Sequence, residues 1–238
     1  ALWSAAEAQL EWRLKGSRWA TTRNFLPGSP MTARRGLRRP PEDAARRISK
    51  PLKKIELLPR AKARVVIEIA RTALAARCRE VVAITHANAD EVYWCDLGEG
   101  AALAVICVSP TCRLPLETNT GYLLFSIGVP IGYGGVTPLF RQANTGINIF
   151  DAFRGGETAF LWVETLRAFH SLFGSTRFIV NGYQFGEGNS EAINSGAYWF
   201  YYRLGFRPDD SGRQRLAAEE FDRLRRPGAP RSGKATLK

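Results

Sequence analysis

The sequence predicts an α/β (α+β) domain built on a strongly twisted, mixed sheet with helices on both of its faces. Three helical segments and about six strand-like segments alternate along the chain. One strand leads through a glycine turn into a strong amphipathic helix, and an aromatic helix ends at Gly205. Alternation of this kind is typical of domains in which helices cover a sheet.

The first half of this domain is predicted to contain a helix, a strand and a hairpin. Proline is tolerated in the first turn of a helix, so we expect a helix from Pro59 to near Arg79. Its apolar face comprises Val65, Val66, Ile69, Ala73 and Leu74. A strand is expected at Val81–Thr85. A hairpin should follow, formed by Val92–Asp96 and Ala101–Val108 with Gly98 and Gly100 in its turn.

The second half contains the segments around which the domain is organised. Strands are expected at 122–127, 131–136 and 144–150, the last at the centre of the sheet and splayed from a strand at 177–181. An amphipathic helix is predicted at 158–173, ending at Gly174. A second helix is predicted at 190–204, followed by a short return strand at Phe206. The first helix would bury Phe160, Leu161, Val163, Leu166, Phe169, His170 and Phe173.

Charge divides the chain into three parts. Residues 1–64 contain 16 Lys and Arg against 5 Asp and Glu, residues 65–206 contain 9 against 12, and residues 207–238 contain 9 against 5. We therefore predict a basic extension and linker at 1–58, the α/β domain at 59–208 and a polar basic tail at 209–238. The basic arm at 13–64 could contact nucleic acid weakly and without sequence preference, although a solvated extension is the simpler interpretation.

The cysteines and the hydropathy of the chain argue against a zinc site and against a membrane-spanning helix. The four cysteines, Cys78, Cys95, Cys107 and Cys112, form no Cys-x2-Cys pair, so no zinc site is expected. We interpret them as buried apolar residues of a protein in the reducing cytoplasm. No apolar run reaches the ~18 residues of a membrane span. The chain begins at Ala1 rather than at methionine, so the lack of a signal peptide carries little weight.

The segment Arg154–Ala159 is predicted to bind an anion. It joins the strand at 144–150 to the helix at 158–173. Backbone N–H groups of a glycine turn and the positive end of the helix dipole both attract phosphate. Glu157 opposes this prediction, because its carboxylate competes for the same positive end. The alternative role of Glu157 is to stabilise the helix dipole, by ~0.3–1 kcal/mol.

These segments resemble the GCN5-related N-acetyltransferases, and in particular a bacterial branch of that superfamily. The resemblance covers about residues 80–208 and implies an acyl-CoA N-acyltransferase-like fold. In the family this turn binds the pyrophosphate of acetyl-coenzyme A. The corresponding residues here are Arg154, Gly155, Gly156, Thr158 and Ala159, with Glu157 in place of a family glycine. The resemblance also implies that Ile149 lies along the pantetheine arm and that Asn194 holds the amide region of the cofactor.

The segment Asn194–Phe206 matches the family pattern Asn-x-x-Ala-x-x-Phe-Tyr-x-x-Leu-Gly-Phe. By this resemblance Tyr201 is the acid that reprotonates the leaving thiolate, a role open to a phenol held at hydrogen-bond distance. Helical spacing should place Tyr198, Tyr201 and Tyr202 on one side of the helix. We expect the Tyr201 hydroxyl to point into a pocket that also touches Ile149 and the turn at 154–156. An aromatic helix packed on a sheet has the same spacing, which leaves a purely structural role open.

No motif marks a general base. The candidates are the loop carboxylates Glu117, Asp151 and Glu187, together with His86. Two functions follow from the sequence. The first is an acyl-CoA-dependent N-acyltransferase that acetylates a small-molecule or peptide amine. The alternative is an acetyltransferase-like domain that binds no cofactor and serves as an interaction or regulatory module.

Overall fold

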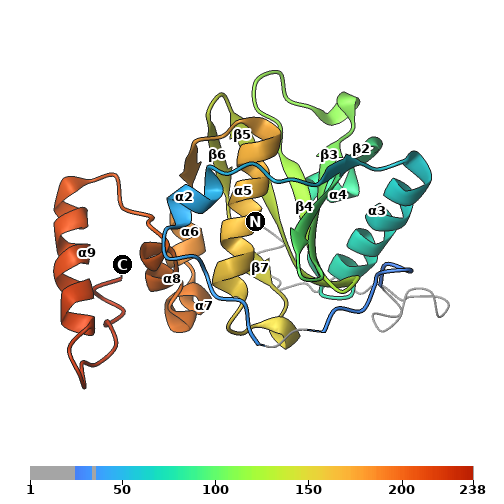
Figure 1. Ribbon diagram of the computed structural model, residues 1–238. Coiled ribbons are helices and arrows are strands. Elements are labelled where there is room, and N and C mark those ends of the chain that lie inside the picture. Colours follow the sequence, from blue (N-terminus) through green and yellow to red (C-terminus); the bar gives the residue numbers. More distant parts are fainter. Residues whose placement is uncertain (1–24, 34–35, 238) are drawn as a thin grey trace.

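A computed structural model describes residues 25–33 and 36–237, and one twisted sheet forms its centre (Figure 1). Seven of the eight strands follow the order β1-β2-β3-β4-β5-β6-β8, and the eighth, β7, pairs with β5 outside this order. Every strand pair is antiparallel except β6 with β8. The strands are β1 (Ile55–Leu57), β2 (Ala87–Gly98), β3 (Ala101–Val108), β4 (Thr120–Ser126), β5 (Val129–Leu139), β6 (Gln142–Thr145), β7 (Asn148–Ile149) and β8 (Arg177–Ile179).

Helices cover both faces of this sheet. α3 (Arg60–Ala75) and α4 (Val82–Thr85) pack on one face, while α5 (Thr158–Phe173) and α8 (Ala197–Arg203) pack on the other. The remaining α-helices are α2 (Ala44–Ile48), α6 (Gly182–Phe185), α7 (Ser190–Ser195) and α9 (Ser211–Leu224), and the 3-10 turns are η3 (Pro110–Cys112) and η4 (Asp151–Phe153). Among the described residues, no helix is both long and apolar enough to cross a membrane.

The period-two alternation of β3 explains the two-sided core. Leu103 and Val105 belong to the cluster around α5, whereas Ala104 and Ile106 belong to the cluster around α3 and α4. Successive side chains of a strand point to opposite faces, so an all-apolar strand buries both. All four of these residues are fully buried. The predicted fold class, a mixed twisted sheet with helices on both faces, is thereby confirmed.

Several predicted elements are confirmed and others are corrected. The helix at 158–173 and the hairpin of β2 and β3 form as expected. Val81–Thr85 is not a strand: residues 82–85 form helix α4, which buries Ile84 against the sheet. The helix at 190–204 is interrupted by Gly196, whose φ of 76° ends α7 before α8 begins. Phe206 begins no strand and packs beside Trp162 and Tyr201.

The strand predicted at 144–150 is broken in two. β6 pairs with both β5 and β8, but β7 pairs only with β5 among the described strands. At the break the Tyr122 hydroxyl donates a hydrogen bond to the carbonyl of Gly146. A Cβ on Gly146 would lie 2.6 Å from the end of the Gln184 side chain, which would have to move to admit it. β6 lies next to edge strand β8 rather than at the centre of the sheet, and β7 forms no pair with β8. The splay of these strands stays a prediction.

Segments on either side of residues 59–208 pack against the sheet and helices. Strand β1 pairs with β2, and α2 lies on the outer side of α5. Trp199 and Tyr202 of α8 contact Phe221 of α9, which lies farthest from the sheet in Figure 1. These contacts cross both predicted domain boundaries, at 58/59 and at 208/209. The division of the chain into three parts stays a prediction.

Candidate functional site

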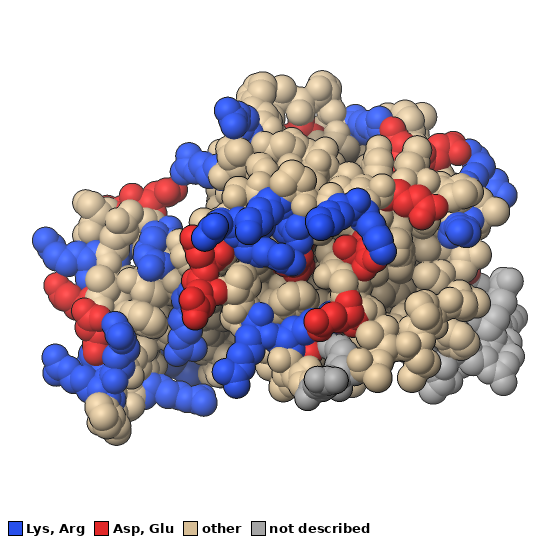
Figure 2. All heavy atoms as spheres, viewed as in Figure 1, with Lys and Arg blue, Asp and Glu red and all other residues tan. Residues whose placement is uncertain are grey.

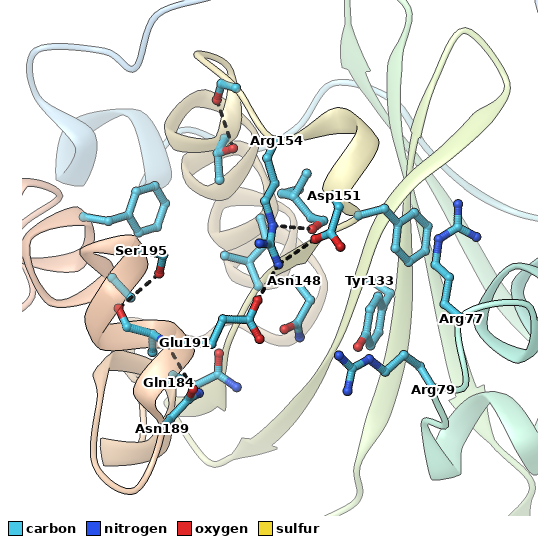
Figure 3. Close-up of a pocket in the computed structure, with 18 of the residues that line it drawn as sticks. Arg77, Arg79, Tyr133, Asn148, Asp151, Arg154, Gln184, Asn189, Glu191 and Ser195 are labelled. Atoms are coloured by element: carbon cyan, nitrogen blue, oxygen red, sulfur yellow. Dashed lines mark hydrogen bonds and ion pairs between the residues drawn. The ribbon is translucent and has the colours of Figure 1, made fainter. Parts of the chain in front are cut away.

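A pocket of about 670 Å³ lies beside β7 (Figure 3). Its size falls within the ~300–1,000 Å³ usual for small-molecule sites. The chain that lines it comes from the end of α3, from β5, from residues 147–158 and from helices α6, α7 and α8. β7 forms no pair with β8, and its residues line one side of this pocket.

Strand β7 separates two walls of this pocket. Ile147 and Ile149 pack with the cluster around α5, whereas Phe150 packs with the cluster around α3. On the α5 wall lie Gly155, Thr158 and Tyr201, and on the α3 wall lie Arg77, Arg79, Tyr133 and Asn148. The alternation of side chains along β7 and its flanking residues thus gives the pocket two chemically different sides.

Arg154 occupies the middle of the site. Its guanidinium makes salt bridges of 2.9 Å with both Asp151 and Glu191, as the dashed lines of Figure 3 show. All three side chains are more than half exposed. Ion pairs this exposed contribute little stability, so an incoming anion can replace the carboxylates at small cost.

The turn before α5 presents free backbone donors. Within the described chain, the N–H groups of Gly155 and Gly156 donate to no acceptor. The opposing carboxylate of Glu157 is held elsewhere, because Arg38 donates to it from its backbone at 3.0 Å and from its guanidinium at 2.8 Å. Glu157 does not line the pocket. The expected competition between Glu157 and a phosphate is therefore reduced.

Tyr201 lies on the α5 wall and is only 4% exposed. Its ring packs edge-on against Trp162 and Phe206. Burial raises the pKa of Tyr201 to about 12, and a hydrogen bond with the backbone of Ile147 partly offsets this rise. The phenol therefore keeps its proton throughout the neutral range.

The three tyrosines of α8 do not share one side as expected. Tyr198 and Tyr202 pack with Trp199 toward α9, in a cluster separate from that of Tyr201. The C-terminal helix supplies an apolar surface that the sequence pattern of α8 alone does not reveal. Only Tyr201 of the three lines the pocket.

The remaining predicted residues divide between the pocket and its surroundings. Ile149, Arg154, Gly155, Thr158 and Tyr201 line it together. Gly156 lies outside, beside the Leu37 side chain, and Ala159 is half-buried in the first turn of α5. Asn194 is exposed on α7 and does not line the pocket. The cofactor and catalytic roles of all these residues stay predictions.

The candidate bases also separate. Asp151 lines the pocket, whereas Glu117, Glu187 and His86 do not. The carboxylate of Glu191 lines it as well, although sequence reasoning did not select it. Sequence reasoning also missed Arg77, Arg79 and Tyr133, because these residues belong to no motif and the fold alone brings them to the site.

The cysteines and carboxylates provide no metal centre among the described residues, where no group of three or more His, Cys, Asp or Glu side chains could hold an ion. All four cysteines are free. Cys95 is buried as expected, but Cys78 and Cys112 are exposed, which corrects the interpretation of all four as buried residues.

Comparisons with known proteins identify no relative: no protein-family model matches the chain, and neither a curated protein nor a solved structure matches it significantly.

Proposed function

We propose that this protein is an acyl-CoA-dependent N-acyltransferase of the kind that its sequence resembles. The observation that carries the proposal is the convergence of separately predicted parts on one pocket. Ile149, the Arg154–Gly155 turn and Tyr201 come from a strand, a loop and the last helix of the domain. If the aromatic helix served only to pack on the sheet, there would be no reason for these three parts to line the same pocket.

The residues of the α5 wall fit an acetyl-coenzyme A molecule. Gly155 offers an unpaired N–H group just before the N-terminus of a 16-residue helix, which suits a pyrophosphate. β7 has no strand partner on its β8 side among the described residues, so its backbone edge can bond an extended arm. Arg154 would exchange Asp151 and Glu191 for phosphate oxygens.

The chemistry assigned to this site is proton transfer around an activated acyl group, which the cofactor supplies when bound. Tyr201 holds a proton at its phenolic oxygen, available to a thiolate leaving group. Asp151 and Glu191 are the carboxylates of the pocket that can accept a proton from an ammonium. Tyr201, the proposed acid, is buried, whereas Asp151 and Glu191, the proposed bases, are exposed to solvent.

Incubation with acetyl-coenzyme A and a panel of small amines tests the enzyme hypothesis, with free thiol as the readout. Amine-dependent thiol release that falls in Tyr201→Phe is the expected result. Release that does not depend on any amine, or that is equal in the variant, contradicts the proposed chemistry.

The alternative is a domain of the same fold that binds no cofactor and serves as an interaction or regulatory module. The contacts of Arg154 and Glu157 favour it, because both side chains already have partners within the chain. Leu37 also lies against Gly156. Binding of acetyl-coenzyme A separates this alternative from the enzyme.

Location and further contacts also belong to the proposal. Four unpaired thiols are typical of a reducing compartment, which supports a cytoplasmic protein. Figure 2 shows basic side chains gathered around α2 and the chain that follows it, where Arg46, Lys50, Lys53 and Lys54 are exposed. These residues belong to the arm proposed to contact nucleic acid weakly. Part of that arm, residues 1–24 and 34–35, lies outside the described residues.

A further inference from the structure

The α3 wall of the pocket contains two arginines that the proposed chemistry does not use. Arg77 and Arg79 follow the end of α3 and line the same cavity as Tyr201. Neither forms a salt bridge with any carboxylate in the described chain, in contrast to Arg154, which forms two. Two guanidinium groups without a carboxylate partner in one pocket indicate a site for an anion that comes from outside.

The fold holds the guanidinium of Arg77 in place, whereas Arg79 is exposed and is held through its backbone. The guanidinium of Arg77 lies 3.8 Å from the centre of the Phe150 ring and donates a 2.8 Å hydrogen bond to the carbonyl of Ala73. The backbone N–H of Arg79 bonds the carbonyl of Leu74 at 3.0 Å, which fixes the chain after the helix. Prior fixation lowers the entropy lost when a ligand binds.

Tyr133 adds a hydroxyl between these groups. Its ring stacks on Phe150 with 5.6 Å between the ring centres, and Figure 3 shows the Arg79 guanidinium beside its hydroxyl end. Burial raises the pKa of Tyr133, while the charge of Arg79 lowers it and the charge of Glu191 raises it. The hydroxyl remains protonated and can donate to an oxygen atom.

Charges of both signs line the pocket. Arg77 and Arg79 lie on the α3 wall, while Asp151 and Glu191 pair with Arg154. Asp151 also acts on the charge of Arg77, and Glu191 acts on Tyr133. An acceptor that carries both an amine and an oxyanion offers a partner to each kind of charge. Arginine recognises carboxylate and phosphate through paired N–H groups, whereas it repels a second cation.

We propose that the acceptor is an amine that also carries a carboxylate or a phosphate, and that Arg77, Arg79 and Tyr133 bind this oxyanion. The substrate class rests on the proposed acyltransferase, but the oxyanion site itself does not. The cofactor would occupy the α5 wall and the acceptor the α3 wall, on either side of β7.

Calorimetric titration with two probes, inorganic phosphate and succinate, tests the site without any cofactor. The wild-type protein should bind at least one probe saturably, and the probe that binds more tightly identifies the preferred oxyanion. Arg79→Gln should weaken binding about tenfold or more, the scale of one lost charge-assisted hydrogen bond. Arg64→Gln is the matched control, because Arg64 is exposed on α3, outside the pocket, and the change in net charge is equal.

Three results would overturn the inference. One is the lack of saturable binding of both probes, and another is equal weakening by Arg64→Gln, which indicates general charge attraction. The third is a loss of acetyl-coenzyme A affinity in Arg79→Gln as large as the loss of phosphate affinity, which assigns the arginines to the cofactor. If the protein binds a probe through Arg79 but does not bind acetyl-coenzyme A, the oxyanion site is supported and only the proposed transferase activity is contradicted.

Discussion

Tyr201 is the residue on which the proposed chemistry depends. It packs against Trp162 and Phe206 through its ring, so Tyr201→Phe keeps almost all of this contact. We expect the free energy of unfolding to change by no more than about 1 kcal/mol, because one hydrogen bond is lost. Turnover should fall about 100-fold or more, the usual effect of losing a general acid. Steady-state rates and denaturant unfolding of both proteins measure the two quantities, and equal turnover would contradict the assignment.

Buried thiols and phenols predict a loss of stability at alkaline pH. Burial raises the pKa of Cys95 to about 12, and burial also raises that of Tyr201 to about 12. The folded state therefore binds more protons than the unfolded state above the ordinary pKa of a thiol. The stability contribution is full below about pH 8.5, declines as pH rises further, and is lost by about pH 12.

Denaturant unfolding at pH 7 and pH 10, in the presence of a reductant, measures this effect. Cys95 alone should account for a loss of about 2 kcal/mol over the interval. Cys95→Ala should show a shallower decline, whereas Cys112→Ala should not, because Cys112 is exposed. An unchanged slope in Cys95→Ala would assign the decline to other groups.

At the scale of elements, α5 is buried on more sides than its pattern predicts. Glu164 is fully buried and pairs with Arg47 at 2.6 Å and with Arg167 at 3.0 Å. Arg167 also donates to the carbonyls of Lys50 and Pro51. The chain around α2 thus covers the charged side of α5, which otherwise would face solvent.

This ion cluster predicts a large effect for one substitution. Glu164→Ala leaves Arg167 buried without its carboxylate, which should reduce the free energy of unfolding by about 3–5 kcal/mol. Asp222→Ala in α9 removes an exposed carboxylate and should change it by no more than about 0.5 kcal/mol. Urea unfolding compares the two, and a similar small effect of both would show that the cluster contributes little.

Sequence periodicity predicted elements well where one element has one apolar face. α5 shows this at its end, because Gly174, with a φ of 66°, stops the helix where the sequence predicts, although Glu164 and Arg167 on its other sides are buried as well. It failed for Val82–Thr85, where a short apolar run suits a buried helix as well as a strand. It also missed the break at Gly196, because whether the chain adopts the left-handed conformation there depends on tertiary packing.

At the scale of the whole molecule, the candidate site was only partly predictable. The sequence motifs pointed to residues 149–158 and to Tyr201, because both segments belong to the pattern of the family that the chain resembles. Arg77, Arg79 and Glu191 could not be selected, because their position depends on how α3, β7 and α7 meet around the splayed strands. The pairing of Glu157 with Arg38 was equally hidden, since 119 residues separate the two.

Binding of acetyl-coenzyme A tests the central claim most directly. A Cβ added to Gly155 would meet no atom within 4 Å, and this residue needs no left-handed backbone, so Gly155→Val should fold while crowding the phosphate turn. Gly36→Val is the matched control, because Gly36 has equally open surroundings and lies outside the pocket.

Calorimetric titration of these three proteins with acetyl-coenzyme A should give saturable binding below about 1 mM for the wild type and for Gly36→Val. Gly155→Val should bind at least about tenfold more weakly, a loss of about 1.4 kcal/mol. No heat from the wild-type protein at millimolar acetyl-coenzyme A, or equal affinity in Gly155→Val, would contradict the claim that this pocket holds the cofactor.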